Sequence, residues 1–289
     1  MIDAAYAACA RLARRHYENF PVASILLPPA MRPHISAIYA FARTADDFAD
    51  EGTSSDDTRL RQLDRWQQWL RDAADGREID STDPGAVAVF TALGDTIRRC
   101  RVDVRLLDDL LSAFRQDVLV KRYATWDALS DYCRRSANPV GRLVLAVADV
   151  RDPRTEDASD ALCTALQLTN FWQDLARDWE KGRLYVPASV ARANGADEQD
   201  LDRGTMTPAW RQALRDAVRR TREHFDTGRS VADRVQGRLR WELRATWLGG
   251  VRVLDLLERA DFDVFHRRPS LGWTDAPSIA WRAVAWRPR

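Results

Sequence analysis

The chain has 289 residues, and its hydrophobic content of 45% is enough to bury a sizeable core. Its 44 lysine and arginine residues balance 43 aspartate and glutamate residues, so the net charge of +1 gives no general attraction to nucleic acid. The four cysteines and four histidines are scattered, without the spacing of a zinc site or a disulfide framework. These properties argue against a nucleic-acid partner and a zinc site, and they favour a reducing compartment.

Membrane insertion is not expected either. Met1 is followed by Asp3 and an amphipathic pattern instead of an apolar leader. No apolar run approaches the roughly 18 residues that span a bilayer. We therefore expect a cytoplasmic protein that is soluble, or at most peripheral at the inner membrane surface.

The first part of the chain predicts two helices separated by a turn. Residues 3–17 repeat apolar side chains at helical spacing. Four prolines prevent a long helix between residues 20 and 33, namely Pro21, Pro28, Pro29 and Pro33. Pro33 suits the first turn of the second helix, which contains IYAFARTADDFADE and is expected to end at Gly52.

This second helix carries an acidic pair. Asp46 and Asp50 are four residues apart, so their carboxylates project from one face of a helix, one turn apart. Arg43 lies one turn before them. Asp47 points elsewhere on the helix, where a surface or capping contact is expected. Taken alone, an acidic pair at this spacing more often faces solvent than holds a cation.

The middle of the chain predicts further helices over residues 57–75, 86–99, 104–120 and 126–147. Thr125 is the expected N-cap of the last of them. That helix contains the sequence SANPVG, in which Pro139 removes one backbone hydrogen bond. We therefore expect a bend there, with a free carbonyl near Arg135.

A second acidic pair lies on a helix expected over residues 158–181. Asp174 and Asp178 are again four residues apart, with apolar neighbours on either side. Asn170 lies one turn earlier on the same stripe. Gly182 is expected to end this helix, and the sequence RLYVP leads away from it.

The rest of the chain predicts polar turns over residues 188–206, a helix over 207–227 and a long helix over 231–260. The tail over 262–289 is rich in tryptophan and arginine. It could dock on a membrane surface, or it could pack against the bundle through Ile279, Trp281, Val284 and Trp286. Since no segment predicts a strand ladder, a Gly-rich phosphate loop or a linker, we expect one all-α domain over residues 1–289.

The two acidic pairs together predict metal chemistry. If the two helices face each other, four carboxylates surround one cavity, and their repulsion requires divalent cations between them. Ligands that are all oxygen suit Mg²⁺, which takes one or two carboxylates together with substrate phosphates. The chemistry indicated is metal-assisted loss of a diphosphate.

The two aspartate segments, their order and their flanking residues resemble those of the squalene and phytoene synthase family. The resemblance runs from His16 to about Leu257. It implies a helical isoprenoid synthase bundle around a central cavity. It also implies that Asp46, Asp50, Asp174 and Asp178 bind Mg²⁺.

The same resemblance suggests residues that bind diphosphate. Arg43 matches the family pattern R-x-x-D-D, and Arg183 with Tyr185 matches the pattern R-x-Y. Asn170 is expected to complete a metal or phosphate shell. The alternatives are surface arginines and a core amide bonded to the backbone, since this chain is rich in arginine.

Aromatic residues are the candidates for stabilising a carbocation. Tyr39 and Tyr132 match family positions near the reacting carbons, whereas Phe41 and Trp172 are expected in the core. Asn138 is expected to position a water molecule or to make a local turn contact. The further candidates are Phe171 and, in the substrate cavity, Phe20.

Within the family the chain is most similar to the members that form hydroxysqualene in bacterial hopanoid biosynthesis, because of Asn138-Pro139. At residues 19–22 it reads NFPV where condensing members have Ser-Phe-x-Tyr, which argues against joining two substrates. The function implied is a carbon–oxygen lyase that acts on presqualene diphosphate, with other enzymes of the squalene pathway as partners. The alternatives are a prenyltransferase that condenses two farnesyl or geranylgeranyl diphosphates, and a non-catalytic helical assembly factor.

Overall fold

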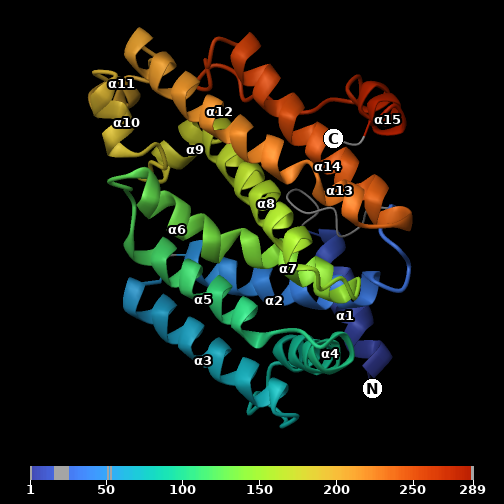
Figure 1. Cartoon of the computed structure of the whole chain (residues 1–289). Coiled ribbons are helices and arrows are strands. Elements are labelled where there is room, and N and C mark those ends of the chain that lie inside the picture. Colours follow the sequence, from blue (N-terminus) through green and yellow to red (C-terminus); the bar gives the residue numbers. More distant parts are fainter. Residues whose placement is uncertain (1, 16–25, 51, 53, 288–289) are drawn as a thin grey trace. The chain divides into compact units, whose positions relative to one another are not determined.

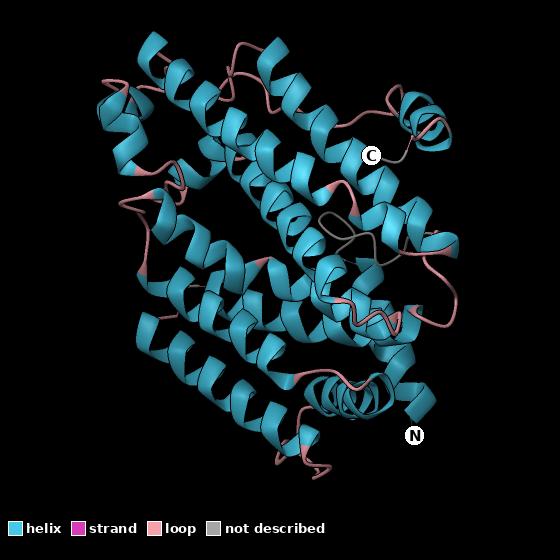
Figure 2. Cartoon of the chain, viewed as in Figure 1, coloured by secondary structure: helices cyan, strands magenta, loops and turns pink. Residues whose placement is uncertain are grey.

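The computed structural model describes residues 2–15, 26–50, 52 and 54–287. Of the described residues, 73% are helical. The described residues form α-helices and short turns, without a β-strand, and one isolated bridge joins Arg122 to Leu184 (Figure 2). The predicted all-α fold is confirmed.

The chain divides into two compact units, and one unit comprises Met1–Leu119 with Pro139–Asp152. The other comprises Val120–Asn138 with Pro153–Arg289. That the chain works as one domain stays a prediction. The helices of the first unit are α1 (Ile2–Arg15), α2 (Arg32–Asp50), α3 (Asp56–Ala74), α4 (Pro84–Cys100), α5 (Val104–Leu119) and, beyond its first residue, α7 (Asn138–Val147) (Figure 1).

The second unit is also helical throughout its described part. Its helices are α6 (Trp126–Ser136), α8 (Pro153–Gln173), α9 (Leu175–Glu180), α10 (Ala188–Ala193), α11 (Glu198–Asp202), α12 (Pro208–Gly228), α13 (Val231–Arg234), α14 (Gly237–Arg259) and α15 (Ala276–Val284). In the described chain, no helix is both long enough and apolar enough to cross a bilayer.

Side-chain caps explain where several helices begin. The hydroxyl of Thr125 accepts a hydrogen bond from the backbone N–H of Ala128 at 3.3 Å, which confirms the predicted N-cap of α6. Thr207 caps α12 in the same way, and Pro208 occupies its first turn. Thus local polar sequence sets these helix starts.

The first unit is built around aromatic side chains of α2, α3 and α4. The rings of Trp66 and Phe90 lie 4.5 Å apart, and Phe41 packs on both. The indole N–H of Trp66 donates to the carbonyl of Phe41 at 3.2 Å, so this buried polar group is satisfied. The prediction that Phe41 belongs to the core is confirmed.

The second unit is built around the packing of α8 on α12, which lie side by side (Figure 1). The buried indole of Trp172 donates to the hydroxyl of Thr221 at 2.9 Å, which confirms Trp172 as a core residue. At Gly228 an added Cβ would lie only 2.5 Å from the backbone nitrogen of Leu162. Glycine therefore permits the close approach of the two helices.

The structure differs from the sequence prediction at two long helices. The helix expected over 158–181 is interrupted at Asp174, which separates α8 from α9. The helix expected over 231–260 is interrupted between α13 and α14, where Val235 is extended and Gly237 has a φ of 62°. The first segment contains no glycine or proline that would mark a break, whereas Gly237 in the second is a signal that the prediction did not use.

Short helices replace two expected irregular regions. Residues 188–206 contain α10 and α11, which end near Gly195 and Gly204, both at positive φ. The tail contains α15, which packs through Ile279 and Trp286 as one alternative predicted. Trp281 and Val284 do not pack, since they are 72% and 65% exposed. The helix predicted over 126–147 is interrupted at Ala137, between α6 and α7, close to the disruption predicted at Pro139.

Candidate active site

The first acidic pair lies on α2 beside an arginine. The guanidinium of Arg43 contacts the carboxylates of Asp46 at 3.3 Å and Asp47 at 2.6 Å. All three side chains are partly buried, with exposed fractions between 22% and 37%. Asp47 therefore makes an ion pair on its own helix, and Asp50 lies half-buried one turn beyond Asp46.

Tyr39 lies one turn before Arg43 on α2 and is half-buried. Burial raises the pKa of its phenol, and the positive charge of Arg43 partly opposes this change. Tyr39 is therefore a neutral hydroxyl at physiological pH, close to the charges of the acidic segment.

The second acidic pair is connected through the backbone of α8 and α9. The N–H of Asp174 donates to the carbonyl of Asn170 at 2.8 Å, and the N–H of Asp178 donates to the carbonyl of Asp174 at 2.9 Å. Because these are helical bonds, the three residues keep the predicted stripe even though the helix is interrupted. Asn170 is exposed, and both aspartates are partly buried.

Arg268 was not predicted as a site residue, but it binds the first aspartate of this pair. Its Nε donates to Asp174 Oδ1 at 2.5 Å and its Nη2 donates to Asp174 Oδ2 at 3.0 Å. The side chain of Asp174 is 17% exposed. Nearby, Gln173 donates to the carbonyl of Pro269 at 2.5 Å, so the chain segment bearing Arg268 is attached at two adjacent points.

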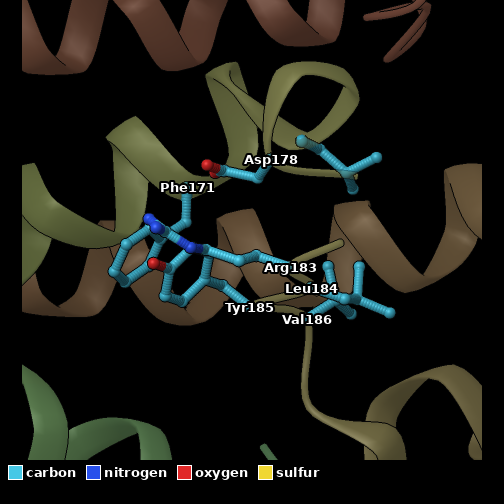
Figure 3. A pocket seen from close by; sticks show the side chains of 7 residues that line it. Phe171, Asp178, Arg183, Leu184, Tyr185 and Val186 are labelled. Carbon is cyan, nitrogen blue, oxygen red and sulfur yellow. The ribbon is translucent and has the colours of Figure 1, made fainter. Parts of the chain in front are cut away.

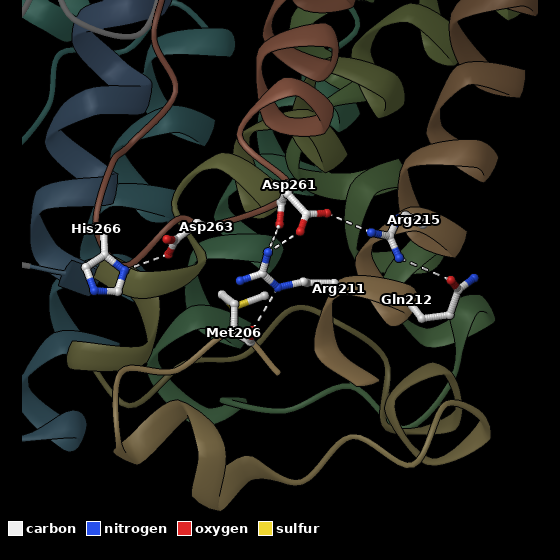
Figure 4. Close-up of polar contacts among 7 residues, drawn as sticks. All are labelled: Met206, Arg211, Gln212, Arg215, Asp261, Asp263 and His266. Atoms are coloured by element: carbon white, nitrogen blue, oxygen red, sulfur yellow. Dashed lines mark hydrogen bonds and ion pairs between the residues drawn. The ribbon is translucent and has the colours of Figure 1, made fainter. Parts of the chain in front are cut away.

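The segment that precedes Arg268 is also held by ion pairs (Figure 4). Arg211 and Arg215 of α12 both bind the carboxylate of Asp261, and Arg215 does so at 2.7 Å. These guanidinium groups, Arg211 first, hold the pKa of Asp261 below its usual range. Five residues after Asp261, the Nδ1 of His266 lies 2.8 Å from the carboxylate of Asp263. The position of Arg268 is therefore built into the second unit.

Arg183 and Tyr185 follow the end of α9. Gly182 has a φ of 75°, as predicted for a glycine that ends a helix, and the N–H of Arg183 donates to the carbonyl of Asp178 at 2.7 Å. The side chains of Asp178, Arg183 and Tyr185 line a small hollow together with Phe171 (Figure 3), and this hollow is too narrow to hold a water molecule. The R-x-Y segment thus lies directly beside the second acidic pair.

Tyr132 belongs to a cluster of aromatic rings in the second unit. The rings of Phe171 and Tyr185 stack at 3.7 Å and 6°, and the ring of Tyr132 lies 6.1 Å from both. Tyr123 lies 5.5 Å from Tyr132. Tyr132 is only 4% exposed, so it combines a core position with closeness to the hollow.

Asn138 is oriented by a hydroxyl group of α8. Thr164 donates to the amide oxygen of Asn138 at 2.9 Å, and 26 residues separate them along the chain. The contact is therefore a tertiary one and not a local turn contact. Phe20, the residue predicted for the substrate cavity, lies outside the described residues.

The donor set of the acidic segments fits Mg²⁺. Each unit has two aspartates at i and i+4, and carboxylate oxygens are ligands that Mg²⁺ prefers. Over the described residues, no three His, Cys, Asp or Glu side chains gather closely enough to hold a metal ion by themselves. Mg²⁺ usually takes one or two carboxylates and completes its shell with waters and substrate oxygens. That the two pairs meet stays a prediction.

The whole chain was compared with known families. The profile of squalene/phytoene synthases matches residues 13–275. The chain belongs to the squalene/phytoene synthase family. Members of this family make isoprenoids from prenyl diphosphates, generally with divalent metal ions.

Similar members of the family include two bacterial hydroxysqualene synthases. The protein from Zymomonas mobilis is 42% identical over 71% of this chain and 66% of its own length. The protein from Rhodopseudomonas palustris is 38% identical over 84% of this chain and 80% of its own length. This chain therefore spans about two thirds of the first relative and four fifths of the second.

A solved structure shows the fold of this family. The crystal structure of squalene synthase HpnC from Alicyclobacillus acidocaldarius matches with a TM-score of 0.82 and 37% identity. The match covers 90% of this chain and 95% of that chain. The all-α isoprenoid synthase fold expected from the sequence is therefore confirmed.

Proposed function

We propose that this protein is a hydroxysqualene synthase that converts presqualene diphosphate and water into hydroxysqualene and diphosphate. The observation that carries the proposal is the identity of 42% and 38% to two hydroxysqualene synthases. In this reaction the carbon–oxygen bond to diphosphate breaks, and the electron pair leaves with the diphosphate. The cyclopropylcarbinyl cation rearranges, water forms the new carbon–oxygen bond, and one proton is released.

Arg43 and Arg183 are the residues proposed to hold the diphosphate. A guanidinium presents forked donors that match phosphate oxygens and stays charged at every relevant pH. Arg43 is oriented by Asp46 and Asp47, and the backbone of Arg183 is bonded to Asp178. Each arginine therefore lies next to an acidic segment. A site for a diphosphate and its metal ion requires this arrangement, because the guanidinium binds phosphate oxygens and the carboxylates bind the metal ion.

Asn170 and Tyr185 are proposed to add neutral donors to this site. Asn170 is exposed one turn before Asp174, so its amide is free of core packing. Tyr185 lines the hollow beside Asp178 and Arg183.

The proposed ligands of Mg²⁺ are Asp46, Asp50, Asp174 and Asp178. Bound Mg²⁺ would neutralise the charge that develops on the departing diphosphate, which is worth several kcal/mol in such reactions. The contribution of the chain itself is to hold two oxygen donors one helical turn apart in each unit.

Aromatic groups are proposed to stabilise the carbocation. A ring face near a cation contributes about 0.5 to 2 kcal/mol. Tyr132 lies in the cluster of Phe171 and Tyr185, and Tyr39 lies beside the first acidic pair. Phe20 is proposed to line the part of the cavity that receives the chains of the substrate.

Asn138 is proposed to position the water that captures the rearranged cation. Its amide oxygen accepts from Thr164, which fixes the amide plane and determines where the amide N–H groups point. Water must be held back until rearrangement is complete, because earlier capture would give a different alcohol.

Product analysis distinguishes the proposed function from its two alternatives, a condensing prenyltransferase and a non-catalytic assembly factor. The purified protein with Mg²⁺ is given presqualene diphosphate in one assay and farnesyl or geranylgeranyl diphosphate in others, and products are identified by mass spectrometry. Conversion of presqualene diphosphate to hydroxysqualene supports the proposal. Conversion of farnesyl diphosphate alone to a C30 diphosphate, or of geranylgeranyl diphosphate to phytoene, would make the protein a condensing prenyltransferase. An assembly factor would convert none of them.

The proposed site of action is the cytoplasm, at the inner membrane surface. A C30 diphosphate must be supplied by an enzyme that condenses two C15 diphosphates, so enzymes of the squalene pathway are the proposed partners. No nucleic acid takes part in this chemistry.

A further inference from the structure

Helix α15 is fixed to the second unit by one face only. Ala283 and Trp286 pack in a small core with Ala232 and Leu248, and Ile279 packs against it. The indole N–H of Trp286 donates to the carboxylate of Asp233 at 3.0 Å. The helix is therefore held rigidly through its inner face.

The outer face of α15 is apolar but exposed. At 100° per residue, Pro277, Trp281, Val284 and Ala285 form one stripe, on the side opposite to Ala283. Trp281 is 72% exposed and Val284 is 65% exposed. Pro277 and Ala285 are exposed as well.

A second exposed tryptophan precedes the helix. Trp273 is 95% exposed, and Leu271 beside it is 44% exposed. Large apolar side chains exposed together are uncommon on the surface of a monomer and mark an interaction site. We call Leu271, Trp273, Pro277, Trp281 and Val284 the tryptophan surface.

The charges around the tryptophan surface are positive. Arg282 and Arg287 are exposed on and just after α15, and Arg267 is exposed shortly before it. The acidic residue between positions 271 and 287 is Asp275, which is only 8% exposed and bonded to Arg252 at 2.7 Å. Within residues 271–287 the surface therefore presents tryptophan and arginine without an exposed carboxylate.

We propose that the tryptophan surface docks on an anionic lipid bilayer. Tryptophan prefers the interface between lipid and water, because its ring is apolar and its N–H is polar. Arginines on the flank of an apolar helix face add attraction to anionic headgroups. The exposed apolar side chains and the three exposed arginines along residues 267–287 therefore match the apolar interior and the anionic headgroups of such a bilayer.

The inference does not depend on the proposed function, although a C30 alcohol would leave such an enzyme directly into lipid. The exposed arginines and the projecting tryptophan rings alone point to a lipid bilayer as the partner of this surface. An alternative occupant of an exposed apolar surface is a second copy of the chain, and the experiment separates the two.

The test is co-sedimentation of the full-length protein with vesicles. One set contains phosphatidylcholine alone, and the other contains about a third phosphatidylglycerol. The wild-type protein is expected to bind the anionic vesicles and to be released by high salt. Trp281→Ser with Val284→Ser should lower the partition coefficient about tenfold, and Arg282→Gln should weaken binding to anionic vesicles alone.

Leu119→Ser is the matched control, since Leu119 is 62% exposed and belongs to the first unit, whereas the tryptophan surface belongs to the second. This variant should bind vesicles like the wild type. Light scattering of each variant in solution gives its oligomeric state. The proposal is overturned if the wild type ignores anionic vesicles, if the double variant binds as well as the wild type, or if that variant converts a dimer to a monomer.

Discussion

Arg268 holds both carboxylate oxygens of Asp174, although 94 residues separate them along the chain. A guanidinium on both oxygens of a carboxylate occupies the positions that a metal ion would use. The proposed metal ligand therefore has a protein cation as its partner, from the segment after α14. Any metal ion that binds Asp174 must share this carboxylate with Arg268 or displace it.

Replacing Arg268 should strengthen metal binding in the absence of substrate. Because Arg268→Gln removes the competing charge, we expect the affinity for Mn²⁺ to rise about three- to tenfold, which corresponds to a change of about 1 kcal/mol. Titration of free Mn²⁺ by electron paramagnetic resonance measures this without turnover. The gain should vanish when Asp174→Asn is added, because the two residues act on one site.

Arg177→Gln provides the control for that prediction. The guanidinium of Arg177 lies 3.9 Å from the Asp174 carboxylate and is 66% exposed, so solvent screens its charge. We expect unchanged Mn²⁺ affinity in this variant. Equal affinities in the wild type and Arg268→Gln would refute the competition between Arg268 and the metal.

The two neighbouring aspartates of α2 should differ in their importance. Asp46→Asn removes a proposed metal ligand, and we expect turnover to fall about a hundredfold to a thousandfold, for a loss of several kcal/mol of charge stabilisation. Asp47→Asn removes an ion pair with Arg43 that is partly exposed, worth about 0.2–1 kcal/mol. Initial rates with saturating Mg²⁺ measure the difference, and circular dichroism checks the fold. Equal losses of turnover in the two variants would contradict the proposal that Asp46, and not Asp47, binds the metal ion.

Thr164 should control the products through Asn138. In Thr164→Val the shape is kept but the hydrogen bond to the Asn138 amide oxygen is lost, so the amide is no longer fixed. We expect a smaller fraction of hydroxysqualene and more hydrocarbon formed by proton loss, while diphosphate release changes by less than about threefold.

Gas chromatography of the products and a phosphate assay measure the two quantities separately. Thr169→Val is the matched control on α8, since the hydroxyl of Thr169 donates to the carbonyl of Ala165 and is buried. This control should keep the wild-type product ratio. An unchanged ratio in Thr164→Val as well would argue against water positioning by Asn138.

The stability of the protein should fall on mild acidification because of His34. This ring lies 3.0 Å from the hydroxyl of Tyr6, and burial lowers its pKa below the usual value of 6.5, against the charge of Asp95. The unfolded chain therefore binds a proton more readily than the folded protein does. The neutral ring of His34 contributes its full stabilisation above the pKa that it has in the unfolded chain. This contribution is lost as the pH falls through the lower pKa that His34 has in the folded protein.

The melting temperature should accordingly decline between about pH 7.5 and pH 5.5. His34→Gln should make this decline shallower, because glutamine has no proton to gain. A wild-type slope in His34→Gln would assign the acid sensitivity to other groups.

The sequence predicted the parts of the site that repeat at helical spacing. Asp46 with Asp50 and Asp174 with Asp178 were identified because four residues make about one helical turn. Gly182 as a helix end and Thr125 as an N-cap follow from the local chemistry of single residues. The extents of α3, α4, α5 and α12 could be read in the same way, because their apolar residues recur at helical spacing.

Contacts between distant segments could not be predicted in this way. The pairing of Arg268 with Asp174 joins residues 94 positions apart, in a chain where arginine is abundant. The contact from Thr164 to Asn138 is also tertiary. The interruption at Asp174 could not be predicted, because residues 158–181 contain no glycine or proline. These tertiary contacts and the helix break depend on packing and ion pairing, which the spacing of apolar residues does not predict.

The central claim is that this protein ionises presqualene diphosphate and lets water capture the cation. The most direct measurement incubates the purified protein with presqualene diphosphate and Mg²⁺ in water enriched in ¹⁸O, followed by mass spectrometry of the product. The account predicts hydroxysqualene that carries the heavy isotope in its hydroxyl group. A C30 hydrocarbon without oxygen as the sole product, or presqualene diphosphate left unconsumed, would contradict it.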